Sequence, residues 1–317
     1  MTAPLEVGAA GHARCTYRLR VSSTALTALL GEWDRCRCLA GPSLNYNRNG
    51  FRLKDGRLHL AGGIGVTVVW SRDLPADPSS VRVHRDSLGH WYASFVVATE
   101  VQPLPETGNV LGVDWGVKRT ATTTSDTHDF PHVEHGRKAA AKLTGYQRMM
   151  ARRRPKAGQA ASKGYRAAKK LTAKLYKKVA RQRQDTGRKW AKQVVRDHDT
   201  IAVEDFRPKF LAKSTMARKA ADAAISATKA ELINMARKHD RDLRLVRPAH
   251  TTMDCAHCGA RAKHALPLSE RTYTCTACGI SSPRDKNSAR VMLVRAGLNP
   301  ASADRGRPDT PPGRQAA

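Results

Sequence analysis

Four cysteines near the end of the chain have the spacing of a metal site. Cys255 and Cys258 form one C-x-x-C pair, Cys275 and Cys278 form a second, and sixteen residues separate the two pairs. This is the spacing of a structural zinc ribbon, in which four thiolates close a tetrahedral shell around one Zn²⁺. Because such a shell leaves no position for a reactive water, we expect the zinc to be structural rather than catalytic.

Three carboxylates stand out because of the segments that carry them. Asp114 and Glu204 each end a short apolar segment, and Asp285 opens a late helical segment seven residues after Cys278. Phosphodiester hydrolysis can use two divalent cations about 3.5–4 Å apart, and Mg²⁺ or Mn²⁺ takes carboxylate oxygens as ligands. Each acid taken alone is better explained as a turn or helix-cap residue. Their order along the chain, with basic helices and a ribbon between them, favours a catalytic metal site.

The chain is strongly basic. Its 317 residues include 56 Lys and Arg against 27 Asp and Glu, which gives a formal net charge of +29. Such a surplus attracts a polyanion, because each neutralised phosphate releases a condensed counterion. We find no apolar run long enough to span a bilayer and no amphipathic anchor, so nucleic acid is favoured over a membrane. Residues 1–13 lack the features of a signal peptide, and the cysteines show no disulfide framework, so we expect a protein of a reducing cytosol.

Alternating and helical patterns predict the elements of the first third of the chain. A strand at 14–21 places Arg18 and Arg20 on its polar face, and a helical piece follows at 22–38. Asp55-Gly56 predicts a tight hairpin within residues 51–60. A strand at 64–70 and a hairpin at 81–99 complete what we expect to be a small antiparallel barrel.

The remaining elements would position the acids. We expect a strand–turn–strand at 111–124, strands at 200–206 and 243–247, and helices at 217–238 and 285–296. From Arg137 to Arg196 there are 21 Lys or Arg and a single acid, Asp185. Two long basic helices are predicted there, and because acids at pairing distance are missing, contact with a phosphate backbone is favoured over a solvated face. The candidate nucleic-acid-binding residues are Arg18, Arg20, Arg152, Arg153, Arg154, Lys169, Lys170, Lys177, Lys178 and Arg181.

Four segments together resemble a known family. They are Gly112–Lys118, Ala202–Phe206, Pro248–Gly259 and Asp285–Ala289, and they are similar to the split RuvC nuclease motifs and zinc ribbon of the TnpB family. TnpB proteins are transposon-encoded, RNA-guided DNA endonucleases related to the type V CRISPR effectors. The resemblance runs from about residue 14 to about residue 298. It implies guide RNA and target DNA as partners, with a second copy of the chain as a further candidate, and a location in the bacterial cytoplasm in association with the nucleoid.

The resemblance also implies a fold and a set of roles. The fold is mixed α/β and β: an RNase H-like RuvC nuclease domain with an inserted zinc ribbon, plus an N-terminal β-barrel-like wedge domain. Asp114, Glu204 and Asp285 match the catalytic residues and ligands of Mg²⁺ or Mn²⁺, and the four cysteines match the zinc ligands. The expected divisions are a first wedge strand at 1–21, a reduced helical recognition region at 22–49, the wedge domain at 50–108, the RuvC-like domain at 109–251, the zinc ribbon, binding target nucleic acid, at 252–281, the final RuvC helix at 282–299 and a disordered tail at 300–317.

Two departures from the family are visible. Family members usually carry a sizeable helical recognition domain where this chain has only residues 22–49, which leaves fewer contacts for a guide–target duplex. Ser288 stands where the family more often has Ala.

Three functions compete on these observations. The first is an RNA-guided DNA endonuclease that hydrolyses phosphodiester bonds with divalent metal ions. The second is a guide-RNA-dependent DNA-binding protein with weak or no cleavage, and the third is a zinc-ribbon RNA-binding protein whose acids are structural. Three carboxylates facing a polyanion are costly unless a metal ion neutralises them, so the sequence favours the endonuclease.

Overall fold

The structure of the chain is a computed structural model that describes residues 11–40, 43–206, 215–264, 266–267 and 269–299, with only the backbone at 36–40. The expected disordered tail at 300–317 lies outside the described residues. Two compact units are present: one contains Gly8–Val101 and Lys142–Lys177, and the other contains Gln102–Ala141 and residues from Lys178 onward. None of the described helices combines the length and apolar character needed to cross a membrane.

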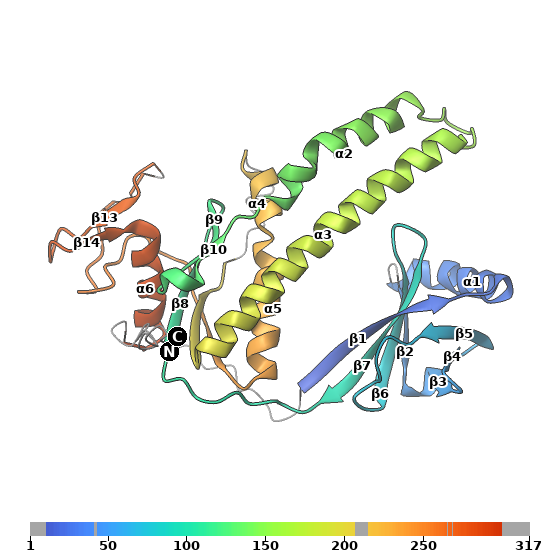
Figure 1. Cartoon of the computed structure of the whole chain (residues 1–317), viewed down its shortest axis with the longest axis horizontal. Coiled ribbons are helices and arrows are strands. Elements are labelled where there is room, and N and C mark those ends of the chain that lie inside the picture. Colours follow the sequence, from blue (N-terminus) through green and yellow to red (C-terminus); the bar gives the residue numbers. More distant parts are fainter. Residues whose placement is uncertain (1–10, 41–42, 207–214, 265, 268, 300–317) are drawn as a thin grey trace, which may run out of the picture. The chain divides into compact units, whose positions relative to one another are not determined.

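The first unit is built on a seven-stranded antiparallel sheet in the order β2-β6-β7-β1-β5-β4-β3 (Figure 1). Its elements are β1 (Gly11–Arg20), α1 (Ser23–Ala40), β2 (Leu44–Asn47), β3 (Phe51–Lys54), β4 (Arg57–Leu60), β5 (Ile64–Val69), β6 (Pro78–Arg85) and β7 (Trp91–Thr99). The predicted strands and hairpins are confirmed, and β2 is an additional strand that the sequence reading missed. Its four residues, paired with β6, are too short for an alternating pattern to be recognised.

Alternation along β1 explains how this sheet divides core from solvent. Cys15, Tyr17 and Leu19 are buried, whereas Arg18 and Arg20 are exposed on the opposite face. The buried side chains pack with residues of β4, β5, β6 and β7 into one hydrophobic cluster, to which α1 also contributes. The Asp55-Gly56 hairpin forms as predicted, with positive φ at both turn residues, 50° and 71°.

The second unit is built on a mixed five-stranded sheet in the order β10-β9-β8-β11-β12. Strand β8 runs antiparallel to β9 and parallel to β11, and β11 runs parallel to β12. The strands are β8 (Val110–Trp115), β9 (Arg119–Thr123), β10 (Phe130–Pro131), β11 (Thr200–Glu204) and β12 (Asp242–Val246). The predicted central strands are confirmed.

Helices cover both faces of this sheet (Figure 1). Leu111, Val113, Ile201 and Val203 pack with residues of α3 (Lys163–Asp197) and α5 (Ile225–Lys238). The alternate residues of the central strands face α6 (Arg284–Arg295), so that Ala202 packs with Met292 and Leu293 of that helix. Because side chains alternate along a strand, Asp114 and Glu204 belong to the face covered by α6.

Two further helical features can be compared with the sequence. The basic segment forms the two predicted helices, α2 (His135–Arg152) and α3. The single helix expected at 217–238 is wrong: the segment forms α4 (Ala217–Ala223) and α5, separated by Ala224 in the left-handed conformation with φ of 52°. An alanine-rich sequence favours an uninterrupted helix, and nothing in its composition marks the break.

Candidate active site and metal centre

Asp114 and Glu204 are brought together by the parallel pairing of β8 and β11. Val113 lies opposite Val203 in the register, so the two acids that follow these valines lie at the same level on adjacent strands. Trp115 fixes the second acid: its backbone N–H donates to Glu204 Oε2 at 3.3 Å, and its indole Nε1–H donates to the Glu204 carbonyl oxygen at 3.1 Å. The sheet therefore presents two neighbouring carboxylates with Glu204 held in place.

Asp285 reaches the same face from the first turn of α6. The helix can approach β8 closely because Gly112 has no side chain: a Cβ at this position would lie 2.1 Å from the carbonyl oxygen of Ala289. This close packing of helix on strand explains why Asp285 is near enough to Asp114 to raise its pKa. The structure thus brings together the three acids that the sequence singled out.

Burial and mutual repulsion change the proton affinity of two of these acids. The pKa of Asp114 is raised well above its ordinary value, first by desolvation and then by the nearby charges of Glu204 and Asp285, while Arg284 opposes the shift. Burial raises the pKa of Glu204 to about 7, although the hydrogen bond from Trp115 and the charge of Lys229 act in the opposite direction. Burial disfavours the ionised form of both carboxylates. A divalent cation bound by their oxygens would stabilise that ionised form, so the two acids are suitable ligands for such a cation.

The three acids are less tightly grouped than the cysteines. Within the described part of the chain, the four cysteines alone form a group of three or more Cys, His, Asp or Glu side chains close enough to hold one ion. The carboxylates do not converge to that degree.

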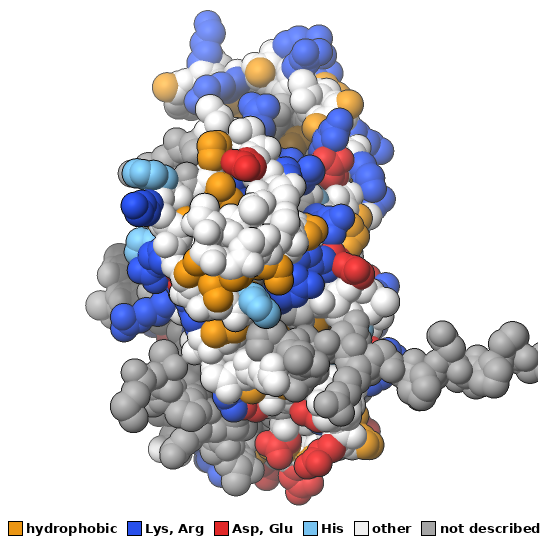
Figure 2. All heavy atoms as spheres, turned by 90° about the vertical axis from the view of Figure 1, so that its left-hand side faces the viewer, with side chains coloured by type: hydrophobic (Ala, Val, Ile, Leu, Met, Phe, Trp, Pro, Cys, Tyr) orange, Lys and Arg blue, Asp and Glu red, His pale blue; other side chains and the backbone are white. Residues whose placement is uncertain are grey.

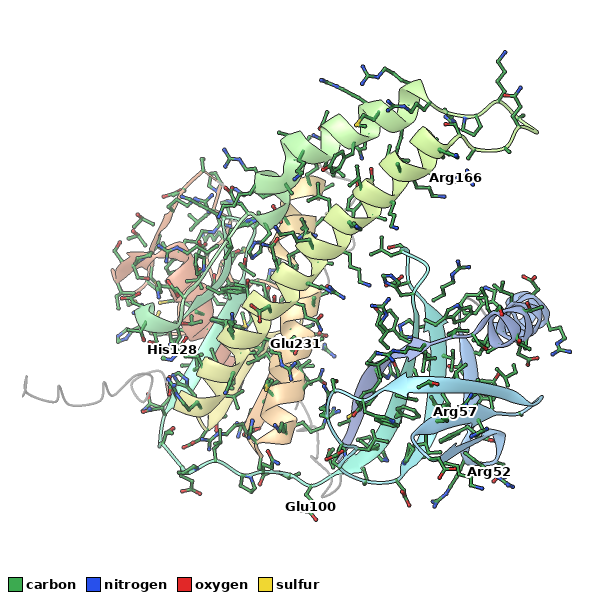
Figure 3. All side chains as sticks on the ribbon, turned by 45° about the vertical axis from the view of Figure 1, so that its right-hand side comes forward. Arg52, Arg57, Glu100, His128, Arg166 and Glu231 are labelled. Carbon is green, nitrogen blue, oxygen red and sulfur yellow. The ribbon has the colours of Figure 1, made fainter. Side chains whose placement is uncertain are left out.

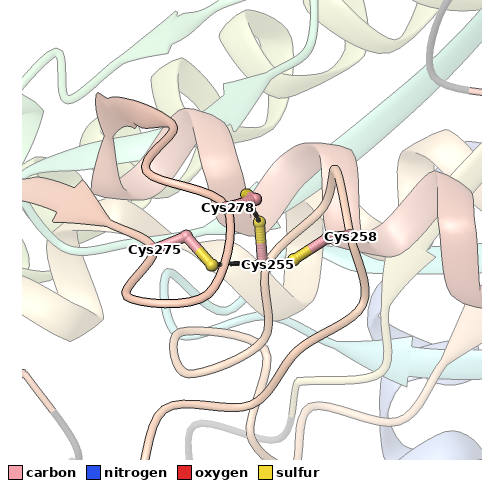
Figure 4. Close-up of side chains that lie close together, drawn as sticks. All are labelled: Cys255, Cys258, Cys275 and Cys278. Atoms are coloured by element: carbon pink, nitrogen blue, oxygen red, sulfur yellow. Dashed lines mark hydrogen bonds between the residues drawn. The ribbon is translucent and has the colours of Figure 1, made fainter.

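The cysteine site has the dimensions of a zinc centre (Figure 4). Cys255, Cys258, Cys275 and Cys278 point their sulfurs toward one another, and all four Sγ atoms lie within 4.8 Å of each other. The distances are 3.8 Å between Cys255 and Cys278 and 3.6 Å between Cys258 and Cys275. A tetrahedron with Zn–S bonds of ~2.3 Å has S···S edges of about 3.8 Å, so the predicted ligands fit Zn²⁺.

Two backbone turns create this site. Gly259 and Gly279 each follow the second cysteine of a pair and adopt positive φ, 75° and 74°. In each turn the glycine N–H donates to the carbonyl oxygen of the first cysteine, at 3.0 Å for Cys255 and 2.9 Å for Cys275. The short strand β13 (Thr272–Thr274) leads into the second turn, and its antiparallel partner β14 (Ser281–Pro283) leads from that turn directly into α6. The ribbon is therefore continuous with the helix that carries Asp285.

The predicted nucleic-acid-binding cations lie mostly on exposed surfaces. Arg18 and Arg20 lie exposed on β1, and Arg152, the last residue of α2, is followed by the equally exposed Arg153 and Arg154. Figure 2 shows Lys and Arg side chains gathered in the upper part of its view, where the α2–α3 hairpin ends, and Figure 3 shows Arg166 near the beginning of α3. Lys169, Lys170, Lys178 and Arg181 are likewise exposed on α3.

Lys177 differs from these residues because it already has partners. Its Nζ forms an ion pair with Asp86 and donates to the hydroxyl of Tyr92 at 3.1 Å. These interactions raise the pKa of Lys177 and lower that of Asp86 to about 2, against the opposing effect of burial. The other predicted cations are therefore better placed than Lys177 to bind phosphate.

Sequence reasoning missed three polar residues around Asp285. Arg284, Lys286 and Asn287 have exposed fractions of 7%, 9% and 3%, although they occupy the polar run that opens a helix. A run of charged and polar residues is usually solvated, and the burial arises because ribbon and sheet both pack against this turn. No pattern in the sequence of this run separates these buried residues from solvated ones.

Comparison with known proteins identifies two matching families. Residues 94–215 match a family described as "Probable transposase" (OrfB_IS605), and residues 228–292 match a family described as "Cas12f1-like, TNB domain". The second match spans the whole ribbon and most of α6. Together the two matches include all three acids and all four cysteines.

The names of individual relatives agree with these family matches. The chain is 31% identical over 261 residues to a Streptomyces pristinaespiralis protein named "Putative RNA-guided DNA endonuclease", covering 81% of this chain and 63% of the relative. It is 28% identical over 241 residues to Escherichia coli "Putative RNA-guided DNA endonuclease InsQ", covering 71% and 58%. A "CRISPR-associated DNA-binding protein Cas12m" of Allomeiothermus silvanus is 29% identical over 133 residues, covering 39% and 25%. The chain thus spans about three fifths of the first two relatives.

Among solved structures, the chain is similar to a Cas12f1 protein in complex with sgRNA and target DNA. The TM-score is 0.48 at 14% identity, covering 79% of this chain and 58% of the other.

Proposed function

We propose that this chain is an RNA-guided DNA endonuclease. The matched families and the bacterial relatives support its similarity to the TnpB family. The observation that carries the proposal is the meeting of Asp114, Glu204 and Asp285 on one face of a mixed sheet, beside a ribbon with four cysteines. The two relatives named as RNA-guided DNA endonucleases match over most of this chain. Pairing with a guide would supply the sequence specificity, and the basic surfaces would bind the nucleic-acid backbone.

The fold supports the RNase H-like RuvC assignment as part of this proposal. A central pair of parallel strands carries two acids, an antiparallel strand lies beside them, and a late helix brings a third acid to the same face. In such an arrangement the acids come from three elements that are distant in sequence, so the position of each is fixed by packing rather than by a loop. We likewise retain the sequence-based division into wedge, nuclease and ribbon segments as a proposal.

The carboxylates of the site would contribute to hydrolysis by binding divalent cations. Asp114, Glu204 and Asp285 would hold Mg²⁺ or Mn²⁺, which supplies activation of water and stabilisation of the leaving oxygen. The backbone N–H of Trp115 holds the Glu204 carboxylate in place on the face of the sheet that α6 covers. Arg284, which lowers the pKa of Asp114, favours the ionised form of that acid that metal binding requires.

A direct test reconstitutes the purified chain with its guide RNA and offers DNA that matches or mismatches the guide. We expect Mg²⁺-dependent cutting of matched DNA alone, with Zn²⁺ remaining bound to the ribbon. Cutting that ignores the guide would contradict the RNA-guided activity, and the omission of RNA is the matched control.

A second candidate function has one observation in its favour. The Cas12m relative, whose printed name describes a DNA-binding protein, matches over 133 residues. The chain would then bind guide-matched DNA with weak or no cleavage. Binding of matched DNA without strand scission in either Mg²⁺ or Mn²⁺ would select this candidate.

The reduced recognition region bears on how the target is opened. A heteroduplex of ~20 base pairs is about as stable as the DNA duplex it replaces, so contacts between protein and backbone must tip the balance. The described part of this region contains the helix α1 and the short strand β2, and few such contacts can come from them. We therefore expect either a second copy of the chain in the complex, or cleavage favoured by negative supercoiling. Mass determination and a comparison of linear with supercoiled DNA test this, and efficient cutting of linear duplex by one protomer would contradict it.

A further inference from the structure

Asp285 is followed by two buried polar residues that connect α6 to different parts of the unit. Lys286 and Asn287 are largely inaccessible, with exposed fractions of 9% and 3%. The first turn of α6 otherwise lacks a side-chain cap, because Pro283 occupies the N-cap position and makes no capping hydrogen bond. Without a cap, this turn is held by the packing of α6 on β8 and by the hydrogen bonds of the residues on either side of Asp285.

Asn287 connects the turn to the metal-binding ribbon. Its Oδ1 accepts a hydrogen bond from the Ala256 N–H at 3.1 Å, and its Nδ2 donates to the Asp254 carbonyl oxygen at 2.8 Å. Ala256 lies between Cys255 and Cys258 in the first cysteine turn. The side chain thus holds the backbone of that turn with both ends of its amide, two residues from Asp285.

Lys286 connects the same turn to the edge of the sheet. Its Nζ donates to the Thr123 carbonyl oxygen at 2.9 Å and to Asp129 at 3.0 Å. Asp129 in turn accepts the Thr123 N–H at 2.8 Å, so the lysine binds a carboxylate that is itself fixed to β9. A further pair with Asp126 involves a side chain that is 92% exposed, where an ion pair contributes little.

We propose that Lys286 and Asn287 are positioning residues for Asp285, and that Asn287 makes the position of this carboxylate depend on the folded, metal-loaded ribbon. This inference rests on the proposed function, because it assigns Asp285 to the metal-binding acids. Groups that bind a catalytic ion must be held to within about 0.5 Å, and a misplacement of ~1 Å can cost about 100-fold in rate. Zinc in the ribbon then has a second role besides folding: through the side-chain amide of Asn287, it helps to keep Asp285 in position.

The alternative is that both residues only satisfy buried hydrogen-bonding groups and stabilise the fold. A stabilising role predicts lower melting temperature without a specific change in metal affinity or turnover. Asn287→Leu removes both hydrogen bonds and approximately keeps the side-chain volume. Ser288→Ala is the matched control, since Ser288 is the next residue, is fully buried, and its hydroxyl lies 3.5 Å from its nearest partner, the Thr251 carbonyl oxygen.

The first measurement is Mn²⁺ affinity of the zinc-loaded protein, read by electron paramagnetic resonance without nucleic acid. We expect Asn287→Leu to weaken Mn²⁺ binding at least tenfold while the zinc content stays near one per chain, and Ser288→Ala to bind as the wild type does. If Asn287→Leu does not fold, Asn287→Asp, which keeps the acceptor for the Ala256 N–H, replaces it. Unchanged Mn²⁺ affinity, or an equal loss in Ser288→Ala, overturns the proposal.

Lys286 is tested by a pair of substitutions. Lys286→Met removes the cation, and Lys286→Arg restores a donor to Thr123 and Asp129. We expect the methionine variant to weaken Mn²⁺ binding and the arginine variant to recover part of it. Equal affinity for the two variants overturns the role of this residue.

The second measurement is guide-directed cleavage. Asn287→Leu should lower kcat by about 100-fold and leave the Kd for guide-matched DNA unchanged. If the wild type binds Mn²⁺ at the acids but cuts no guide-matched DNA, the proposed endonuclease function fails, while the Mn²⁺ affinities still decide the positioning role. A wild type that does not bind Mn²⁺ overturns both.

Discussion

Gly112 on β8 faces the backbone of Ala289 on α6 so closely that a Cβ at residue 112 would lie 2.1 Å from the Ala289 carbonyl oxygen. A backbone atom cannot move aside as a flexible side chain can, so the helix must shift if residue 112 gains a methyl group. This contact sets the distance between the strand that carries Asp114 and the helix that carries Asp285. A glycine in the middle of a strand, otherwise unfavourable, is required here.

Gly112→Ala should therefore lower the free energy of unfolding by about 3 kcal/mol, at the upper end of the range for overpacking. It should also weaken Mn²⁺ binding, because α6 is displaced from β8. Urea denaturation and Mn²⁺ titration check these effects. Gly145→Ala is the control: Gly145 lies in α2 with nothing within 4 Å of a built Cβ, and the change should stabilise by about 0.5–1 kcal/mol. Equal stabilities of the two variants would contradict the close contact.

Zinc content provides a second prediction. The purified chain should hold about one Zn²⁺, and Cys258→Ser or Cys275→Ser should lower metal content and melting temperature together, because metal binding is coupled to folding of the ribbon. Elemental analysis and thermal melting measure this. Cys15→Ala is the control, since Cys15 belongs to the hydrophobic cluster of the first unit and is not one of the four grouped cysteines. Folding that is indifferent to the loss of Cys258 or Cys275 would count against the zinc centre.

The raised pKa of Glu204 predicts a particular dependence of stability on pH. Its value in the folded chain is about 7 against an ordinary value of 4.5, so the folded state keeps a proton that the unfolded state releases. Zinc-loaded protein without added Mg²⁺ should therefore lose stability as pH rises from about 4.5 to about 7. Urea midpoints at pH 5 and pH 8 should differ less in Glu204→Gln than in the wild type.

Added Mg²⁺ should act in the opposite direction. Deprotonated carboxylates bind the cation, so stabilisation by Mg²⁺ should be larger at pH 8 than at pH 5 and should be lost in Glu204→Gln. An identical pH dependence in the wild type and the glutamine variant would contradict the assignment of a raised pKa to this buried acid.

The exposed arginines at the end of α2 should bind phosphate without reading sequence. Changing Arg152, Arg153 and Arg154 to Glu should weaken binding similarly for unrelated DNA sequences and flatten the log–log salt dependence by about one unit for each lost contact. Replacement of the same residues by Lys keeps the charge and should preserve the slope. Binding isotherms at several salt concentrations measure both. A loss confined to one sequence would indicate base-reading residues instead.

Much of this architecture could be predicted from the sequence because its signals are local. Asp55-Gly56 specifies a hairpin, and apolar and polar side chains alternate along β1. The spacing of Cys255, Cys258, Cys275 and Cys278 specifies a metal site. The proximity of Asp114 and Glu204 was also predictable, since each acid follows an apolar strand. The break at Ala224 was not predictable, because tertiary packing selects a left-handed conformation that alanine itself disfavours.

The surroundings of Asp285 were hidden for a different reason. Arg284, Lys286 and Asn287 form a polar run that would ordinarily be solvated. They are buried by the ribbon and the sheet edge, and most of their hydrogen-bond partners are more than twenty residues away in the sequence. Pairwise contacts of this kind leave no periodic pattern. Only the three-dimensional arrangement identifies Asn287 as the link between the cysteine turn and the acidic site.

The central claim is that the carboxylates of one sheet face cut guide-matched DNA, and Asp114 tests it most directly. The measurement compares wild type with Asp114→Asn, each loaded with the same guide RNA and Zn²⁺, for binding and for Mg²⁺-dependent cutting of matched DNA. The account predicts that Asp114→Asn binds matched DNA at least as tightly as the wild type, because a negative charge near phosphate is removed, and that it cuts none. An Asp114→Asn protein that cuts matched DNA at the wild-type rate would contradict the account.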